Sequence, residues 1–341
     1  MTWQVAKMNN ITLENLGIKL IKEADYDEYM ENENPRWRSE CVEQCDFHSF
    51  DGLNLRYYHA SQGEGKEPKG CIVMLHGYCG FWGKFHEVAH FFWQAGFDVF
   101  FLEQRGHGYS GRQIDDKDMV HVMDYADYIA DVKTFMDKIV MPSAGNLPKI
   151  IYAHSMGGAI AALFLEEHPE YFDAAVLSSP MFSIKTGSTP SIAVKLLCAK
   201  IRLLHQENLP FPGGKRFDGI PSFETSSARS EKRYNYIFNQ RLADEHYHTY
   251  MMSNGWGAAS FKATARLLRR ASKVKTPVLL LTAGNDSLVN MSGHEKFAKR
   301  ASNVQHINYE DSKHEIYNDV DEVREKYFND IFTFIMNYAV N

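Results

Sequence analysis

The segment Lys149-Ile-Ile-Tyr-Ala-His-Ser-Met-Gly-Gly-Ala-Ile-Ala-Ala-Leu-Phe164 joins an apolar run, a turn of small residues and an Ala- and Leu-rich run. The apolar residues Ile150 to Ala153 predict a short buried strand, and the run after Gly158 predicts a helix. A sharp turn between such a strand and helix raises a serine hydroxyl above the end of a sheet, as in a nucleophile elbow. Ser155 is therefore a candidate catalytic nucleophile.

A second apolar run upstream predicts the partner of this turn. Cys71 to Leu75 indicates another buried strand, and His76-Gly-Tyr-Cys-Gly80 follows at its end. In a sheet of this kind, the turn after that strand supplies one backbone N–H group to an oxyanion hole, and the residue after the nucleophile supplies the other. We expect these donors to be the N–H groups of Tyr78 and Met156.

Two strand predictions downstream place an acid and a base after the nucleophile. Pro277-Val-Leu-Leu-Leu-Thr282 predicts a buried strand, and Asp286 lies on the loop after it. Val304-Gln-His-Ile-Asn308 predicts the last strand, and His314 lies on the loop that follows. The chain order Ser155, Asp286, His314 is the order in which nucleophile, acid and base occur in this type of sheet. We therefore expect these three residues to form a catalytic triad.

The acid and the base each have alternatives. Asp286 has a second role open to it as the cap of the following helix, because Asp favours that position. Asp311 is a rival acid, but it shares the short loop of His314 and would have to fold back. His314 is preferred over His294 and His306 because it alone follows the final strand.

A zinc-protease pattern, His86-Glu-Val-Ala-His90, is also present, with both histidines on one face of a helix. It lies on the first helix that would flank the sheet, and no third ligand is evident. Three fixed positions also match easily by chance in a chain with 15 histidines. We therefore interpret these histidines as exposed or packing residues, and we expect neither a metal nor another cofactor.

Strands alternate with helices over most of the chain, which predicts an α/β fold with a mostly parallel central sheet flanked by helices. A hairpin from Asp46 to Tyr58, turning at Asp51-Gly52, precedes this alternation. We predict a polar, helix-prone leader at residues 1–40 and a core formed by residues 41–180 and 263–341. The alternation stops at residues 181–262, which we interpret as a cap inserted between two strands.

Length and composition agree with this architecture. The 341 residues suffice for one α/β domain with an insertion, and 44% hydrophobic and 23% charged residues are ordinary for a soluble globular protein. A net charge of −6 argues against nucleic acid as the main partner. Five cysteines, an odd number, favour a reducing compartment. Neither a signal peptide at Met1–Asn10 nor an apolar stretch of about 18 residues is evident, so we expect a cytoplasmic protein.

The cap is basic and partly amphipathic. It contains 11 Lys and Arg residues and 6 Asp and Glu residues, a charge of +5, which leaves −11 for the rest of the chain. Lys195, Lys200 and Arg202 lie beside an apolar stripe, which predicts peripheral contact with an anionic membrane surface on its inner face. The alternative is that the cap helix packs on its own domain and that the charge asymmetry is incidental. The stripe consists of Ile192, Leu196, Ala199 and Leu203, and the aromatic residues that could wall an acyl channel are Phe211, Phe217, Phe223, Tyr247 and Trp256.

Several segments besides the elbow carry a resemblance to a known family: His76-Gly77, Arg105-Gly-His-Gly-Tyr-Ser110, Gly284-Asn-Asp286, Lys313-His314, Phe47-His-Ser-Phe-Asp-Gly52, Ser230-Glu-Lys-Arg-Tyr-Asn235 and, more weakly, Tyr247-His-Thr-Tyr250 and Asn254-Gly-Trp256. With these, residues 40–335 resemble the monoacylglycerol lipase and lysophospholipase branch of the α/β-hydrolases, and most of all its bacterial lysophospholipases of the L-two type. Two positions depart from the family pattern, because Ala153 replaces a glycine and Glu103 an aspartate.

The resemblance implies an α/β-hydrolase fold and hydrolysis of a single acyl ester by a serine nucleophile. The basic, aromatic cap favours a lysophospholipid substrate, with monoacylglycerol or a general carboxyl ester as alternatives. Related proline iminopeptidases apply the same machinery to a free amino terminus, usually recognised by acidic cap residues, and are the main rival among enzymes. A non-catalytic binding protein of the same fold is the alternative outside enzymes.

Overall fold

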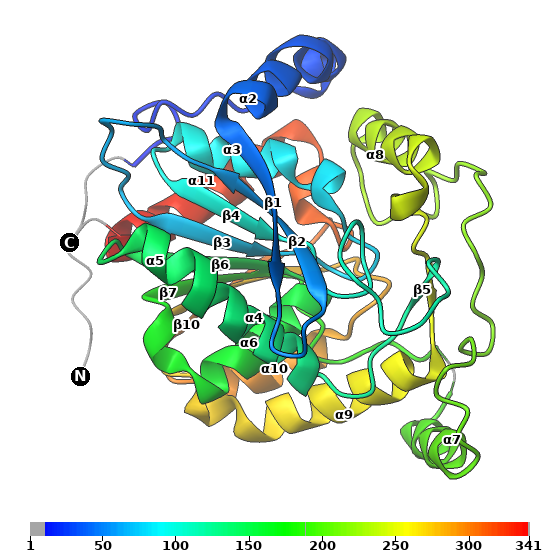
Figure 1. Ribbon diagram of the computed structural model, residues 1–341. Coiled ribbons are helices and arrows are strands. Elements are labelled where there is room, and N and C mark those ends of the chain that lie inside the picture. The colour runs from blue at the N-terminus through cyan, green and yellow to red at the C-terminus, as the bar shows by residue number, and fades with distance from the viewer. Residues whose placement is uncertain (1–10, 188, 340–341) are drawn as a thin grey trace.

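An eight-stranded sheet runs through the centre of the molecule, with helices on both faces (Figure 1). The computed structural model describes residues 11–187 and 189–339, except for the side chains of Ser191, Lys195 and Ala339. Among the described strands of this sheet, β2 alone is antiparallel to the rest. Across the sheet the strands are β1 (Val42–His48), β2 (Asn54–Ala60), β4 (Asp98–Leu102), β3 (Cys71–Leu75), β6 (Lys149–His154), β7 (Ala174–Ser178), β9 (Val278–Ala283) and β10 (Val304–Tyr309).

Alternating side chains of the central strands pack into two hydrophobic layers. On β3, Ile72 and Met74 face one layer, whereas Val73 and Leu75 face the other. The first layer is covered by α3 (His86–Gln94) and α11 (Asp321–Ala339). The opposite layer is covered by α4 (Ala126–Phe135), α6 (Met156–Glu167), α9 (Asn254–Arg270) and α10 (Met291–Arg300). A parallel sheet must be covered on both faces in this way, which explains why the central strands β3, β6, β7 and β9 are buried along their whole length.

The predicted hairpin before the parallel strands is confirmed. Strands β1 and β2 pair antiparallel, with Cys45 opposite Tyr57. Gly52 adopts a φ of +84°, a left-handed conformation that glycine tolerates at the turn. The remaining short elements are η3 (Trp82–Lys84), β5 (Met119–Val120), η4 (Met136–Val140), α5 (Met141–Ala144), η5 (Pro169–Tyr171), η7 (Ala271–Lys273) and η8 (Ile316–Asn318).

The segment before the hairpin is helical, as expected, but it is not a polar leader. It contains η1 (Glu23–Asp25), α1 (Tyr26–Glu28), η2 (Tyr29–Glu33) and α2 (Asn34–Cys41). Its apolar side chains are buried in the layer that contains α3, and the ring of Trp37 stacks on His90 at 4.5 Å between centroids. Residues 11–41 therefore form part of the core packing. Residues 1–10 of the predicted leader lie outside the described residues.

The cap lies between β7 and β9 along the chain and covers one end of the sheet (Figure 1). It contains α7 (Ser191–Leu203), α8 (Glu231–Ala243), η6 (Glu245–Tyr247) and β8 (Met251–Met252), and β8 pairs with β5 of the core. The boundary predicted after Lys262 falls inside α9, because this helix begins in the cap and continues along the core, where Ala263 and Leu267 are buried.

Candidate active site

Ser155 lies at the sharp turn between β6 and α6. Its φ of +52° is unusual for a residue other than glycine, and such strain is typical of a functional turn. A side chain at Gly157 would place its Cβ 2.5 Å from the carbonyl oxygen of Leu75, so strand β3 and helix α6 approach too closely for any other residue. The turn is therefore built as the sequence predicted for a nucleophile elbow.

His314 connects Ser155 to a carboxylate. Its Nε2 atom lies 2.8 Å from Oγ of Ser155, and its Nδ1 atom lies 2.6 Å from Oδ2 of Asp286. A carboxylate can only accept a hydrogen bond, whereas a hydroxyl can also donate one. The imidazole of His314 is therefore expected in the tautomer in which Nδ1–H donates to Asp286 and Nε2 accepts from Ser155. Asp286 follows β9 and His314 follows β10, which are adjacent strands. Three residues distant in the chain are thus joined in one hydrogen-bonded series.

The carboxylate of Asp286 is held in its charged form. Burial alone would raise the pKa of Asp286, but the hydrogen bond from His314 and two backbone N–H groups outweigh it and lower the pKa. The backbone donors are Leu288 and Val289, whose nitrogens lie 2.7 and 3.0 Å from Oδ1. The rival acid Asp311 is exposed, and the carboxylate that contacts His314 is that of Asp286.

The two predicted oxyanion donors flank this serine. Met156 is the first residue of α6, and the first N–H groups of a helix have no acceptor within the helix. Tyr78 lies on the loop after β3, which touches the elbow, because a Cβ at Gly77 would lie 3.0 Å from Cβ of Ser155. That loop is fixed by Gln104, whose backbone nitrogen donates to Nε2 of His76 at 2.9 Å. The backbone of the site is therefore held in place before a substrate arrives.

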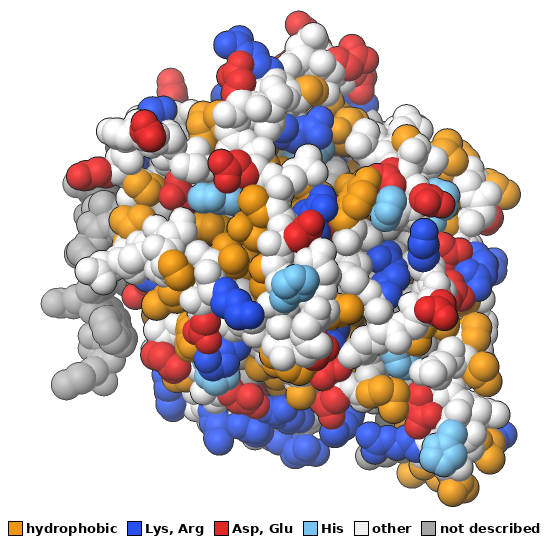
Figure 2. Space-filling view, in the orientation of Figure 1, with side chains coloured by type: hydrophobic (Ala, Val, Ile, Leu, Met, Phe, Trp, Pro, Cys, Tyr) orange, Lys and Arg blue, Asp and Glu red, His pale blue; other side chains and the backbone are white. Residues whose placement is uncertain are grey.

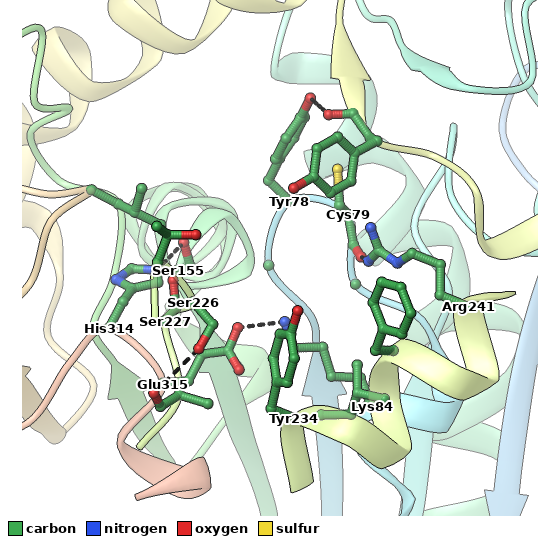
Figure 3. Close-up of a pocket in the computed structure, with 18 of the residues that line it drawn as sticks. Tyr78, Cys79, Lys84, Ser155, Ser226, Ser227, Tyr234, Arg241, His314 and Glu315 are labelled. Atoms are coloured by element: carbon green, nitrogen blue, oxygen red, sulfur yellow. Dashed lines mark hydrogen bonds and ion pairs between the residues drawn. The ribbon is translucent and has the colours of Figure 1, made fainter. Parts of the chain in front are cut away.

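A cavity of about 480 Å³ opens above Ser155, between the core and the cap. This volume is in the range of sites for small molecules. Figure 3 shows Ser155 and His314 on one side of it and Tyr78, Cys79 and Arg241 on the other. Its wall combines aromatic and aliphatic side chains with hydroxyl groups, mainly Phe85, Phe217, Ile220, Ile237, Phe238, Tyr250 and Leu288 on the apolar side and Ser222, Thr225, Ser226, Ser227 and Tyr234 on the polar side.

Three charged residues that are buried or partly buried in the cavity wall were missed by sequence reasoning. Nζ of Lys84 lies 2.5 Å from Oε1 of Glu315, and both side chains are largely buried. Arg241, on α8, is the third. Lys84 and Glu315 are 231 positions apart in the sequence, so their contact could not be predicted. The one available signal was that Glu315 directly follows His314, which could have indicated Glu315 alone. No local pattern marks such contacts.

The loop that begins at Glu103, which carries part of the family resemblance, packs behind the site. Nε and Nη2 of Arg105 donate to the two carboxylate oxygens of Asp131 at 2.5 and 2.6 Å. Glu103 accepts from the backbone nitrogens of Trp82 and Tyr109 at 3.0 and 2.8 Å. Burial raises the pKa of Glu103 to about 7. These residues hold the loops near the cavity and do not line it.

The predicted lipid-binding residues lie away from the cavity. Lys200 and Arg202 are exposed on α7 and do not line it, and the side chain of Lys195 lies outside the description. Of the five aromatic residues proposed for an acyl channel, Phe217 alone lines the cavity. Trp256 is instead buried in the hydrophobic core. Its ring packs behind Tyr78, with the ring centroids 4.8 Å apart.

The histidines of the zinc-protease pattern serve as packing residues. Nε2 of His86 contacts the hydroxyl of Tyr236 at 3.1 Å, and Nδ1 of His90 contacts that of Tyr29 at 2.6 Å. Glu87 between them accepts hydrogen bonds from two arginines. Within residues 11–187 and 189–339, no group of three or more His, Cys, Asp or Glu side chains is arranged to hold a metal ion.

Comparisons with known proteins identify the family of the chain. A family model described as serine aminopeptidase, S33, matches residues 66–321. Monoacylglycerol lipase of Mycolicibacterium smegmatis is 29% identical over 278 residues, which cover 81% of this chain and 92% of that protein. Lysophospholipase L2 of Escherichia coli is 28% identical over 271 residues, which cover 79% of this chain and 78% of that protein.

A solved structure shows the same fold. The crystal structure of the monoacylglycerol lipase of Paleococcus ferrophilus matches with a TM-score of 0.63 at 19% identity, covering 84% of this chain and 99% of that one. The predicted α/β-hydrolase fold and the resemblance to the monoacylglycerol lipase and lysophospholipase branch are thereby confirmed.

Proposed function

This chain belongs to the α/β-hydrolase family described as serine aminopeptidase, S33, and we propose that it is a carboxyl-ester hydrolase that releases a fatty acid from a single-chain lipid. The observation that carries the proposal is the hydrogen-bonded series from Ser155 through His314 to Asp286, which opens on a largely apolar cavity. Lysophospholipid is the preferred substrate class, followed by monoacylglycerol.

In this mechanism the hydroxyl of Ser155 attacks the ester carbonyl while Nε2 of His314 takes its proton. His314 then gives the proton to the leaving alcohol, and Asp286 stabilises the imidazolium and keeps its orientation. The N–H groups of Tyr78 and Met156 donate to the oxyanion of the tetrahedral intermediate. Water, activated by the same histidine, then releases the fatty acid from the acyl-enzyme.

The charges in the cavity wall support a lipid ester over an aminoacyl substrate. A free amino terminus needs an unpaired carboxylate, but Glu315 is already paired with Lys84. Asp218 also lines the cavity, but it is exposed at its edge. Arg241 would repel an ammonium group. The apolar wall, in contrast, matches an acyl chain.

A substrate panel tests this assignment. We expect kcat/KM for a lysophosphatidyl lipid and for monoacylglycerol to exceed that for aminoacyl anilides by at least about tenfold, a difference of about 1.4 kcal/mol in transition-state binding. A p-nitrophenyl ester included in the panel separates an enzyme from a non-catalytic binding protein. Preference for the anilides would overturn the lipid assignment, and a folded protein with no turnover of any ester would favour the binding protein.

We also propose that α7 brings the cap into contact with an anionic membrane surface. The stripe predicted on this helix is exposed, with 65% of Ile192, 65% of Leu196 and 79% of Leu203 accessible to solvent. Figure 2 shows hydrophobic and basic side chains together at this corner of the molecule. Within the described residues, no helix combines the length and hydropathy needed to cross a bilayer. Contact through α7 would be peripheral and reversible.

Vesicle sedimentation tests the contact. Each basic residue near an anionic surface contributes about 1 kcal/mol, so exchange of Lys200 and Arg202 for glutamate should weaken binding to phosphatidylglycerol vesicles by at least about tenfold at low salt. Salt at roughly 0.5 M should weaken wild-type binding as well. Lys299→Glu, on the exposed face of α10, is the matched control. Binding that is absent at low salt, or unchanged in the double variant, would contradict the proposal.

A further inference from the structure

Arg241 extends from α8 into the wall of the active-site cavity, and 8% of the residue is exposed. Its Nη2 atom donates to the carbonyl oxygen of Cys79 at 2.8 Å, as Figure 3 shows. A guanidinium group carries five N–H donors. Its other N–H groups have no hydrogen-bond partner among the described residues. Most of the donor capacity of this cation therefore remains for a ligand.

Aromatic rings, and no carboxylate, surround this guanidinium group. Its central carbon lies 5.5 Å from the ring centroid of Phe81, 5.8 Å from that of Phe217 and 5.4 Å from that of Tyr250. No Asp or Glu of the described residues forms an ion pair with Arg241. Asp218 shares the cavity, but its Oδ1 atom accepts from the backbone nitrogen of Ile220 at 3.0 Å.

The lack of a counter-ion distinguishes Arg241 from the other buried cations of the cap and cavity. Arg233 of the same helix pairs with Glu87 at 2.8 Å, and Lys84 pairs with Glu315. Removal of a cation from water is costly unless an anion compensates it. An anionic group of the substrate would supply this compensation when it enters the cavity.

We propose that Arg241 binds the phosphate of the lipid headgroup and thereby selects single-chain phospholipids over neutral monoacylglycerols. The inference rests on the proposed function and names the residue that determines the headgroup. Guanidinium groups bind phosphate oxygens through paired N–H donors, and such charge-assisted hydrogen bonds are the strong ones.

The position of Arg241 relative to the reacting ester supports this role. Cys79, which accepts from Arg241, directly follows Tyr78, the proposed oxyanion donor. The ester carbonyl would therefore lie close to the guanidinium group. In a lysophospholipid only the glycerol unit separates the ester from the phosphate, so both groups can be held at once. In a monoacylglycerol a neutral hydroxyl occupies the place of the phosphate.

The test compares two substrates with the same acyl chain, a lysophosphatidylcholine and a monoacylglycerol, in wild type and in Arg241→Gln. The ratio of their kcat/KM values is the readout, because any effect on the oxyanion loop through Cys79 lowers both values and cancels. We expect the ratio to fall by about 10- to 100-fold in Arg241→Gln, since a hydrogen bond to a charged group is lost. Arg241→Lys should retain part of the preference, and Arg269→Gln, an exposed arginine on α9, should retain all of it.

A soluble probe separates failure of this inference from failure of the proposed function. Glycerophosphocholine should inhibit wild-type turnover of a p-nitrophenyl ester competitively and should inhibit Arg241→Gln at least about tenfold more weakly. Inorganic phosphate in a parallel assay shows whether the site accepts free phosphate as well as the headgroup. An unchanged substrate ratio, or equal inhibition of both proteins, would overturn the role of Arg241. No turnover of either lipid would instead refute the proposed function.

Discussion

Ester hydrolysis is expected to fall by roughly 10⁴- to 10⁶-fold in kcat when Ser155 is replaced by alanine, because the covalent route is lost and only binding and oxyanion stabilisation remain. The structure places Oγ of Ser155 2.8 Å from Nε2 of His314, and among the described residues no other hydroxyl contacts this nitrogen. The measurement is steady-state turnover of a p-nitrophenyl ester, together with covalent labelling by a fluorophosphonate. Labelling should be lost in parallel with activity.

Two controls separate this result from damage to the fold. Ser302→Ala, an exposed serine before β10, should leave both turnover and labelling intact. A chelator should not lower activity, because every step of the proposed mechanism is assigned to side chains, backbone N–H groups and water. Fluorophosphonate labelling that persists in Ser155→Ala would contradict the assignment, and so would activity that is lost to chelation alone.

The sheet and the elbow could be predicted because local sequence and topology agree there. Small residues around Ser155 are required where α6 crosses β3, and the carbonyl oxygen of Leu75 lies where a Cβ at Gly157 would stand. The pairing of Asp286 with His314 could be predicted because β9 and β10 are neighbours, so loops at the same ends of both strands meet. Their catalytic roles remain predictions until Ser155→Ala is measured.

The residues that shape the cavity could not be predicted in the same way. Arg241 reaches Cys79 across 162 positions of sequence, and Lys84 reaches Glu315 across 231. Neither contact follows from a helix or strand period, because each depends on where the cap settles on the core. The sequence predicted a basic cap but not which of its cations would remain without a partner.

Much of the positive charge of the cap is paired with carboxylates of the core. The cap contains 11 Lys and Arg residues, and among those whose side chains the structure describes, five form ion pairs with carboxylates outside the cap. Much of the positive charge of the cap therefore serves to bind the cap to the core. Only a few cations remain for lipid, among them Lys200 and Arg202 on α7. The five pairs are Arg216 with Asp116 and Asp118, Arg229 with Asp319, Lys232 with Asp27, Arg233 with Glu23 and Glu87, and Lys262 with Asp124.

Arg233 is the centre of the most buried of these contacts. The residue is fully buried, and its Nε and Nη2 atoms donate to the carboxylate of Glu87 at 3.0 and 2.8 Å. Its Nη1 atom donates to Glu23 at 2.9 Å. Nη2 of Arg324, on α11, donates at 2.7 Å to Oε1 of Glu87, the oxygen that also accepts from Nη2 of Arg233. Arg233 and the carboxylates of Glu23 and Glu87 therefore join cap helix α8 to the segment before the hairpin, to α3 and to α11.

Replacement of Arg233 by methionine is expected to lower the free energy of unfolding by about 3–5 kcal/mol, because it removes the buried cation that pairs with Glu23 and Glu87 and leaves Glu87 with Arg324 as its other cation. Domains are stable by only about 5–15 kcal/mol, so this is a large fraction. Urea unfolding, followed by fluorescence, measures the loss as a lower midpoint. Arg36→Met, which breaks the exposed pair with Glu40, should leave the midpoint nearly unchanged, because solvent screens that pair.

A double-mutant cycle identifies the source of the loss. If the contact between Arg233 and Glu87 causes it, the loss in the double variant Arg233→Met, Glu87→Gln should be smaller than the sum of the two single losses by about 1–3 kcal/mol, since neighbours in one network do not add independently. Arg233→Lys keeps the charge but not the paired donors, so its free energy of unfolding should lie between those of wild type and Arg233→Met. This variant still tests the contact if Arg233→Met does not fold. A loss within about 1 kcal/mol for Arg233→Met would show that the cap is held by its apolar contacts and not by this cluster.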